Sequence, residues 1–89
     1  MTNQVTESAG NRIKRLKMRS MRRGIKEMDL ILSAFAGAQL AHMDDARLAQ
    51  YDALLNENDQ DLYQWVTGQV PAPARFGDLI GDISQALQK

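Results

Sequence analysis

The apolar residues of this chain recur at helical spacing in five separate stretches, and no stretch alternates as a strand does. In the most apolar stretch, Met28, Leu32 and Phe35 lie three or four residues apart, so a helix would place them on one face. Short connections separate the stretches, which favours a compact bundle. We therefore expect an all-α fold, a single-domain bundle of about five helices. The expected helices span residues 11–23, 26–42, 44–56, about 58–67 and 76–87.

Residues with strong capping preferences mark the ends of these helices. Asp44 and Asn58 each precede an apolar stretch and are favoured N-caps. Gly68 ends the fourth helix, and the two prolines that follow prevent its resumption. Residues 1–10 lack periodic apolar positions and are interpreted as a disordered tail. The helical domain is then expected at residues 11–89.

Charges are separated along the chain although they cancel in total. The 89 residues include eleven basic and eleven acidic side chains, which gives a net charge of zero. Eight of the basic residues lie between Arg12 and Lys26 with no acid among them, whereas eight acids lie between Asp44 and Asp82. Because neighbouring like charges repel one another, such a separation is typical of a surface that meets a partner.

Composition also limits the compartment and the kind of site. The chain has no cysteine, which excludes disulfides, thiolate metal sites and a cysteine nucleophile. No apolar run approaches the roughly 20 residues that span a bilayer, and the polar first ten residues do not form the apolar core of a signal peptide. We therefore expect a cytoplasmic protein without membrane insertion.

Catalytic or metal chemistry has little support in the sequence. His42 is the single histidine, and no nucleophile-elbow glycines surround any serine. Asn58, Asp59 and Asp61 superficially resemble a calcium loop but lack the glycine and the glutamate that such a loop requires. The glycines are scattered singly, so no phosphate-binding loop is present. We expect neither an enzyme nor a metal site.

The segment from Arg19 to Asp29, RSMRRGIKEMD, is the strongest candidate for recognition. Arginines at helical spacing concentrate their positive field, and the planar guanidinium suits carboxylate or phosphate groups. Glu27 follows Arg23 by four residues, where it can pair with that arginine or be presented beside it. An exposed ion pair contributes only roughly 0 to 1 kcal/mol to stability, so fold stability does not explain the cluster. We interpret the segment as a docking surface in preference to a solvated helix face.

The residues Arg23-Gly24-Ile25-Lys26-Glu27 match the RGxxE signature of the SdhE-type succinate dehydrogenase flavinylation factors. The resemblance covers about residues 12 to 89 and includes the run from Asp59 to Trp65, of the form DxDLYxW. It implies a helical bundle that binds the flavoprotein subunit of succinate dehydrogenase, and often that of fumarate reductase. There it would promote covalent attachment of FAD to a histidine of the partner, as a chaperone-like helper and not as an enzyme.

The resemblance also implies that Arg23, Gly24 and Glu27 dock near the flavin site of the partner. The expected partner-binding residues are Arg19, Arg22, Arg23, Gly24, Glu27 and Asp29. FAD is expected to belong to the flavoprotein, with no cofactor held firmly by this chain, which we expect to be a monomer. The short polar N-terminus resembles the bacterial members of the family and not a mitochondrial precursor.

Other functions are compatible with the same residues. A small regulator that binds nucleic acid through the basic first helix would bind less tightly as salt rises, because neutralised phosphates release counterions. The acidic second half opposes that approach, and no helix-turn-helix pattern is present, so we do not expect a nucleic-acid partner. A toxin-neutralising partner protein and a helix lying on a membrane surface are the further alternatives.

Overall fold

The computed structural model describes residues 8–87, and helices are the regular secondary structure of this part of the chain. It contains five α-helices: α1 (Ala9–Met21), α2 (Lys26–Gln39), α3 (Asp45–Leu54), α4 (Asp59–Thr67) and α5 (Gly77–Leu87). Two 3-10 helices accompany them, η1 (Leu40–His42) after α2 and η2 (Ala74–Phe76) before α5. The predicted all-α bundle of about five helices is confirmed.

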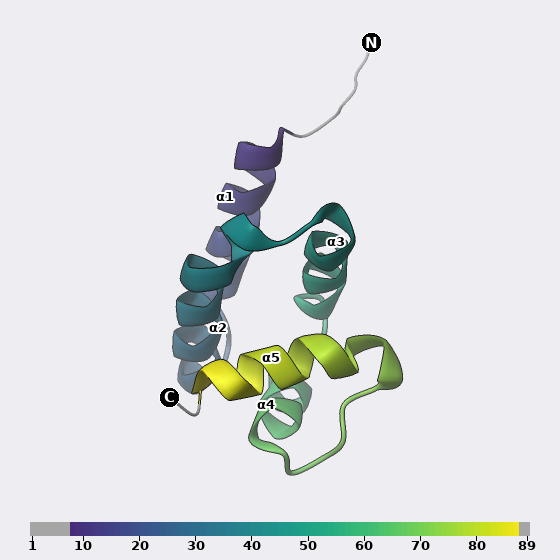
Figure 1. Cartoon of the computed structure of the whole chain (residues 1–89). Helices are drawn as coiled ribbons and strands as arrows, with labels where there is room; N and C mark the ends of the chain where they lie inside the picture. Colours follow the sequence, from purple (N-terminus) through teal and green to yellow (C-terminus); the bar gives the residue numbers. More distant parts are fainter. Residues whose placement is uncertain (1–7, 88–89) are drawn as a thin grey trace.

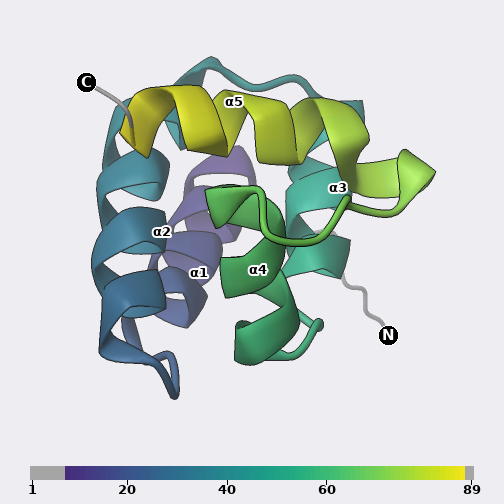
Figure 2. The ribbon, with the colours of Figure 1, turned by 90° about the horizontal axis from the view of Figure 1, so that it is seen from below.

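The helices are arranged around α2, which contacts α1, α4 and α5. α1 and α2 run antiparallel, and α3 stands across from them (Figure 1). α5 crosses one face of the bundle, and α4 lies at the lower end of the molecule in Figure 1 and between α2 and α3 in Figure 2. Within residues 8–87, no helix is long and apolar enough to span a bilayer.

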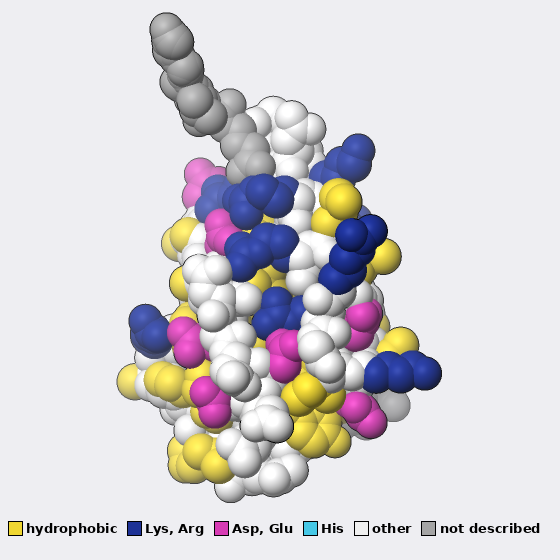
Figure 3. All heavy atoms as spheres, turned by 180° about the vertical axis from the view of Figure 1, so that it is seen from behind, with side chains coloured by type: hydrophobic (Ala, Val, Ile, Leu, Met, Phe, Trp, Pro, Cys, Tyr) yellow, Lys and Arg dark blue, Asp and Glu magenta, His cyan; other side chains and the backbone are white. Residues whose placement is uncertain are grey.

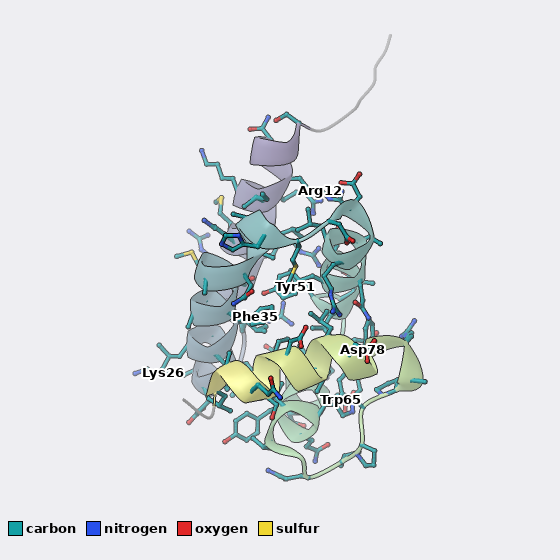
Figure 4. The ribbon with its side chains drawn as sticks, viewed as in Figure 1. Arg12, Lys26, Phe35, Tyr51, Trp65 and Asp78 are labelled. Atoms are coloured by element: carbon teal, nitrogen blue, oxygen red, sulfur yellow. The ribbon has the colours of Figure 1, made fainter. Side chains whose placement is uncertain are left out.

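The core forms where the apolar faces of these helices meet. Phe35 of α2 and Tyr51 of α3 point toward one another, with ring centroids 5.9 Å apart (Figure 4). Trp65 of α4 packs against Phe76 with ring centroids 6.2 Å apart. Burying one large apolar side chain contributes roughly 1.5–3 kcal/mol, so this shared core is the main reason that the helices associate. The fully buried large side chains are Tyr51 and Phe76 together with Leu16, Met28, Leu32, Leu40, Leu54, Leu62, Val66, Leu79 and Ile83.

The caps that the sequence predicts are present. The side chain of Asp44 accepts a hydrogen bond of 2.8 Å from the backbone N–H of Arg47, and Asn58 caps α4 in the same manner. Gly68 ends α4 in the left-handed region, at φ 83°, a conformation that glycine adopts without steric cost. These polar residues set where α3 begins and where α4 begins and ends.

Both ends of α1 differ from the prediction, and α2 and α3 end at Gln39 and Leu54, before the predicted residues 42 and 56. α1 begins at Ala9 instead of residue 11, because the side chain of Ser8 accepts a hydrogen bond from the N–H of Asn11 and caps the helix. The rest of the predicted tail, residues 1–7, lies outside the described residues. α1 also ends at Met21, two residues before the predicted end, because the chain turns there to bring Arg23 against α4.

Candidate functional site

The segment that joins α1 to α2, residues 22–25, forms a corner, and the arginines that lead into it are engaged within the fold. Four of them, spaced three or four residues apart, share one face and meet acids of α3 and α4. Figure 3 shows basic and acidic side chains adjacent on this face. The pairs are Arg12–Asp45, Arg15–Asp52, Arg19–Asp52 and Arg23–Asp59. The separated charges of the sequence are therefore brought together by folding, and the interpretation that fold stability does not explain the cluster is wrong for Arg23, whose pair with Asp59 is largely buried.

Asp52 is the acid that joins two of these arginines. Arg15 Nη2 lies 3.1 Å from its Oδ2 atom, and Arg19 donates to its other oxygen. Arg19 also donates a hydrogen bond of 2.7 Å to the side-chain oxygen of Asn56. The hydrogen bond from Arg15, together with the charges of both arginines, holds the pKa of Asp52 below its ordinary value. Arg19, predicted to bind a partner, is thus engaged by α3.

Arg23 is more enclosed than the other paired arginines. Its side chain is 11 % exposed, and that of Asp59 is 16 % exposed. Arg23 Nε donates to Asp59 Oδ1 over 2.7 Å, and its two terminal nitrogens donate to the backbone oxygens of Leu55 and Glu57 over 3.0 and 3.3 Å. The expected outward display of Arg23 is wrong, because its donors are used by the α3–α4 connection. Arg23 also pairs with Asp59 and not with Glu27.

Gly24 is held by the same carboxylate. Its backbone N–H donates to Asp59 Oδ2 over 2.5 Å. A Cβ atom at this position would lie 3.2 Å from that oxygen, closer than ordinary van der Waals contact. Because Asp59 is the first residue of α4, the positive end of the helix also favours its negative charge. Glycine therefore permits the close approach of the corner to α4, and its outer side stays exposed.

Among the other predicted docking residues, Arg22 and Glu27 are exposed. Neither has an ion pair with another residue of the described part of the chain. Asp29 is half-buried and accepts a hydrogen bond of 3.3 Å from Ser33 Oγ. The structure thus leaves Arg22, Gly24 and Glu27 accessible at the corner, whereas Arg19, Arg23 and Asp29 have contacts within the chain.

Asp52 and Asp59 are the residues of this site that reasoning from the sequence missed. Asp45 and Asp52 are seven residues apart, which places them on one face of a helix, two turns from each other. Arg12 and Arg19 are also seven residues apart, so the two rows of charge can face one another. This matching spacing was the available signal for the ion pairs. Asp59 lies inside the DxDLYxW run, and from the sequence it was considered only as part of a calcium loop, which the spacing did not support.

A buried hydroxyl pair fixes α1 against α3 behind the arginines. Ser20 Oγ donates to the backbone oxygen of Leu16 over 2.8 Å. Because its single proton is used there, the hydroxyl of Tyr51 donates to Ser20 Oγ, over 2.6 Å. Burial raises the pKa of Tyr51 above its ordinary value of 10.0, although the bond to Ser20 opposes the shift. The pair belongs to the scaffold that supports the corner.

Metal-binding groups do not gather in the part of the chain that the structure describes. No set of three or more histidine or acidic side chains in residues 8–87 lies close enough to hold a metal ion. Three acids of α3 and α4, Asp45, Asp52 and Asp59, are instead spaced apart, each paired with an arginine. The site is therefore a surface of paired and unpaired charges around a tight corner.

A family model and individual relatives identify the same protein family for this chain. Residues 14–87 match the family described as the flavinator of succinate dehydrogenase. A protein of Candida glabrata named succinate dehydrogenase assembly factor 2, mitochondrial, is 45 % identical over 75 residues, which cover 81 % of this chain and 49 % of the relative. The protein of the same name from Drosophila grimshawi is 42 % identical over 76 residues, which cover 83 % of this chain and 52 % of the relative. The chain thus spans about half the length of these curated relatives.

The names of these relatives indicate a cellular compartment. Each describes a mitochondrial protein. The expected cytoplasmic location is therefore wrong on this comparison, which points to the mitochondrion. The expectation rested on the absence of an apolar signal segment, and that absence does not distinguish the two compartments.

Proposed function

Because this chain belongs to the succinate dehydrogenase flavinator family, we propose that it is an assembly factor for that enzyme. It binds the flavoprotein subunit of succinate dehydrogenase and promotes covalent attachment of FAD to that subunit. The single observation that carries the proposal is the family match over residues 14–87, which includes the α1–α2 corner and most of α1 through α5. The same activity toward the flavoprotein of fumarate reductase is a further part of the proposal.

The docking surface that we propose is the accessible part of the corner. Arg22 and Glu27 are exposed charges with no ion pair inside the described chain, so their charges are available to a partner. Gly24 lies between them, and the absence of a side chain lets a partner surface approach the backbone closely. Arg23 supports this surface from within through Asp59, and Arg19 and Asp29 border it.

The role that we propose is not catalytic. FAD belongs to the flavoprotein, and the reacting histidine is a residue of that partner. A rigid corner can act by favouring the conformation of the partner in which flavin and histidine are aligned, since a ligand shifts a conformational equilibrium by its differential affinity for the two states. The rigidity is supplied by the hydrogen bonds of Arg23 and Gly24 to Asp59.

The nucleic-acid alternative is weakened by the charge pairing. Four of the eight basic residues between Arg12 and Lys26 are paired with acids of α3 and α4. Arginines used in this way are not free to neutralise phosphates. We therefore do not propose this function.

A binding experiment with a matched pair of glycine variants tests the proposal. Gly24→Arg places a long side chain on the docking surface, whereas Gly37→Arg places it at an exposed position of α2 where nothing lies within 4 Å of the added Cβ. Immobilised flavoprotein subunit should retain the unchanged chain and Gly37→Arg, and it should lose Gly24→Arg. Equal retention of both variants would contradict the proposed surface, and no retention of the unchanged chain would contradict the function.

A further inference from the structure

A polar hollow lies beside the corner, between the start of α2 and α4. It has a volume of about 450 Å³ and is open to solvent. One wall comes from the α2 side and the other from α4 and the residues just after it. The lining residues are Ile25, Glu27, Gln60, Tyr63, Gln64 and Gln69.

The chemistry of this lining favours a positively charged group. Glu27 is the single charged residue in it, and the described chain supplies no cation to pair with it. The amide oxygens of Gln60 and Gln64 and the hydroxyl of Tyr63 add neutral acceptors. The half-buried ring of Tyr63 adds a face on which a flat cation can stack. An anion would meet the charge of Glu27 and find no compensating cation among the lining residues.

We propose that this hollow receives the guanidinium group of an arginine presented by the flavoprotein partner. The inference rests on the proposed function and names what the partner must bring to it. Arginine fits better than lysine because its planar group carries five donors, which match a carboxylate and several amide oxygens at once and also stack on an aromatic ring. Glu27 is then the anion that recognises the partner, and Gln60, Tyr63 and Gln64 orient the guanidinium.

The contacts of Asp59 explain why the two walls are held at a fixed separation. Its carboxylate binds Arg23 and the N–H of Gly24, directly before the wall residue Ile25. Asp59 itself directly precedes Gln60, on the opposite wall. The contacts of Asp59 therefore join the segments that carry the two walls. Binding an arginine in a hollow of this kind does not require the walls to be ordered at the moment of association, which lowers the entropic cost.

Dissociation constants for the purified flavoprotein subunit test the proposal. Glu27→Gln keeps the shape of the side chain and removes its charge, so it should weaken binding on the order of 10-fold or more. Replacing Gln60 and Gln64 together by alanine should weaken binding by a smaller factor. Asp78→Asn, which removes an exposed acid of α5 outside the hollow, is the matched control and should bind as the unchanged chain does. Because all these side chains are exposed, the melting temperatures should stay close together.

A charge exchange identifies the cation. Glu27→Arg should abolish binding, and changing one surface arginine of the flavoprotein to glutamate should restore it. The inference is overturned if Glu27→Gln binds within twofold of the unchanged chain, or if no single arginine replacement restores binding to Glu27→Arg; in both cases the proposed function stands. Failure of the unchanged chain to bind the flavoprotein overturns the proposed function and this inference with it.

Discussion

Arg23 and Asp59 lie 36 residues apart in the chain and form the contact that ties the α1–α2 corner to α4. The same aspartate binds the backbone of Gly24. The two ends of the Arg-Gly-x-x-Glu segment therefore differ in their surroundings. The side chain of Arg23 is turned into the fold, whereas that of Glu27 is exposed to solvent.

Removing Arg23 should destabilise the fold much more than removing its neighbour. Arg23→Ala leaves the charge of Asp59 unpaired and removes the donor from its Oδ1 atom and from two backbone oxygens, and breaking a largely buried ion pair costs about 3 kcal/mol. Arg22→Ala removes an exposed side chain without an ion pair in residues 8–87 and should change the free energy of unfolding by less than about 0.5 kcal/mol. Urea denaturation measures both values. Equal stability of the two variants would refute a structural role for Arg23.

Two glycine-to-alanine changes should have opposite effects on the stability of the fold. Gly24→Ala brings a Cβ to 3.2 Å from a carboxylate oxygen that Arg23 holds in place, so we expect a loss of about 1 kcal/mol. Gly37→Ala adds a methyl group in open space at an exposed helical position, where alanine is favoured by about 0.5–1 kcal/mol. Thermal unfolding followed by circular dichroism distinguishes them. A gain for Gly24→Ala would show that the corner is looser than the contacts indicate.

Acid should weaken the contact of α1 with α3 through Asp52. The pKa of this carboxyl is lower in the folded chain than in the unfolded chain, so the unfolded state binds the proton more readily as pH falls. The stabilisation is present above about pH 4, the unfolded value, and is lost as pH falls through the lower folded value. Asp52→Asn should be less stable than the unchanged chain at pH 7, and this difference should shrink at pH 3. A difference independent of pH would exclude this role of the carboxylate.

Alkali should weaken the fold through Tyr51. Its pKa is raised by burial, so its neutral form is favoured in the folded chain. The stabilisation is complete below about pH 10, the unfolded value, and is lost as pH rises through the higher folded value. Tyr51→Phe loses a hydrogen bond and should be less stable by about 1 kcal/mol at pH 7, and the difference should diminish above pH 10. Urea denaturation of both chains at pH 7 and above pH 10 measures this difference. A difference in stability that grows above pH 10 would contradict the prediction.

The helices and their caps were predictable because the signals for them are local. Met28, Leu32 and Phe35 recur at helical spacing on one face and are buried. Asp44 and Asn58 cap the helices that they precede, because a capping side chain bonds to a backbone group only two or three residues away. Apolar periodicity and capping both depend only on residues that are close in the sequence.

The direction of Arg23 was not predictable from local spacing. Periodicity places a residue on a face of its own helix and does not show which other helix that face meets. Glu27 is the acid close to Arg23 in the sequence, yet the acid that binds it is Asp59, brought near by the packing of α2 against α4. Arg22 and Glu27, in contrast, are exposed, and their binding to a partner stays a prediction.

Reconstitution with purified components tests the central claim most directly. Flavin-free flavoprotein subunit is incubated with FAD, with or without this chain, and the flavin that stays attached after denaturing electrophoresis is measured by its fluorescence. We predict that the unchanged chain and Gly37→Arg raise the covalently flavinylated fraction and that Gly24→Arg does not. The same covalent fraction with and without the chain would contradict the account.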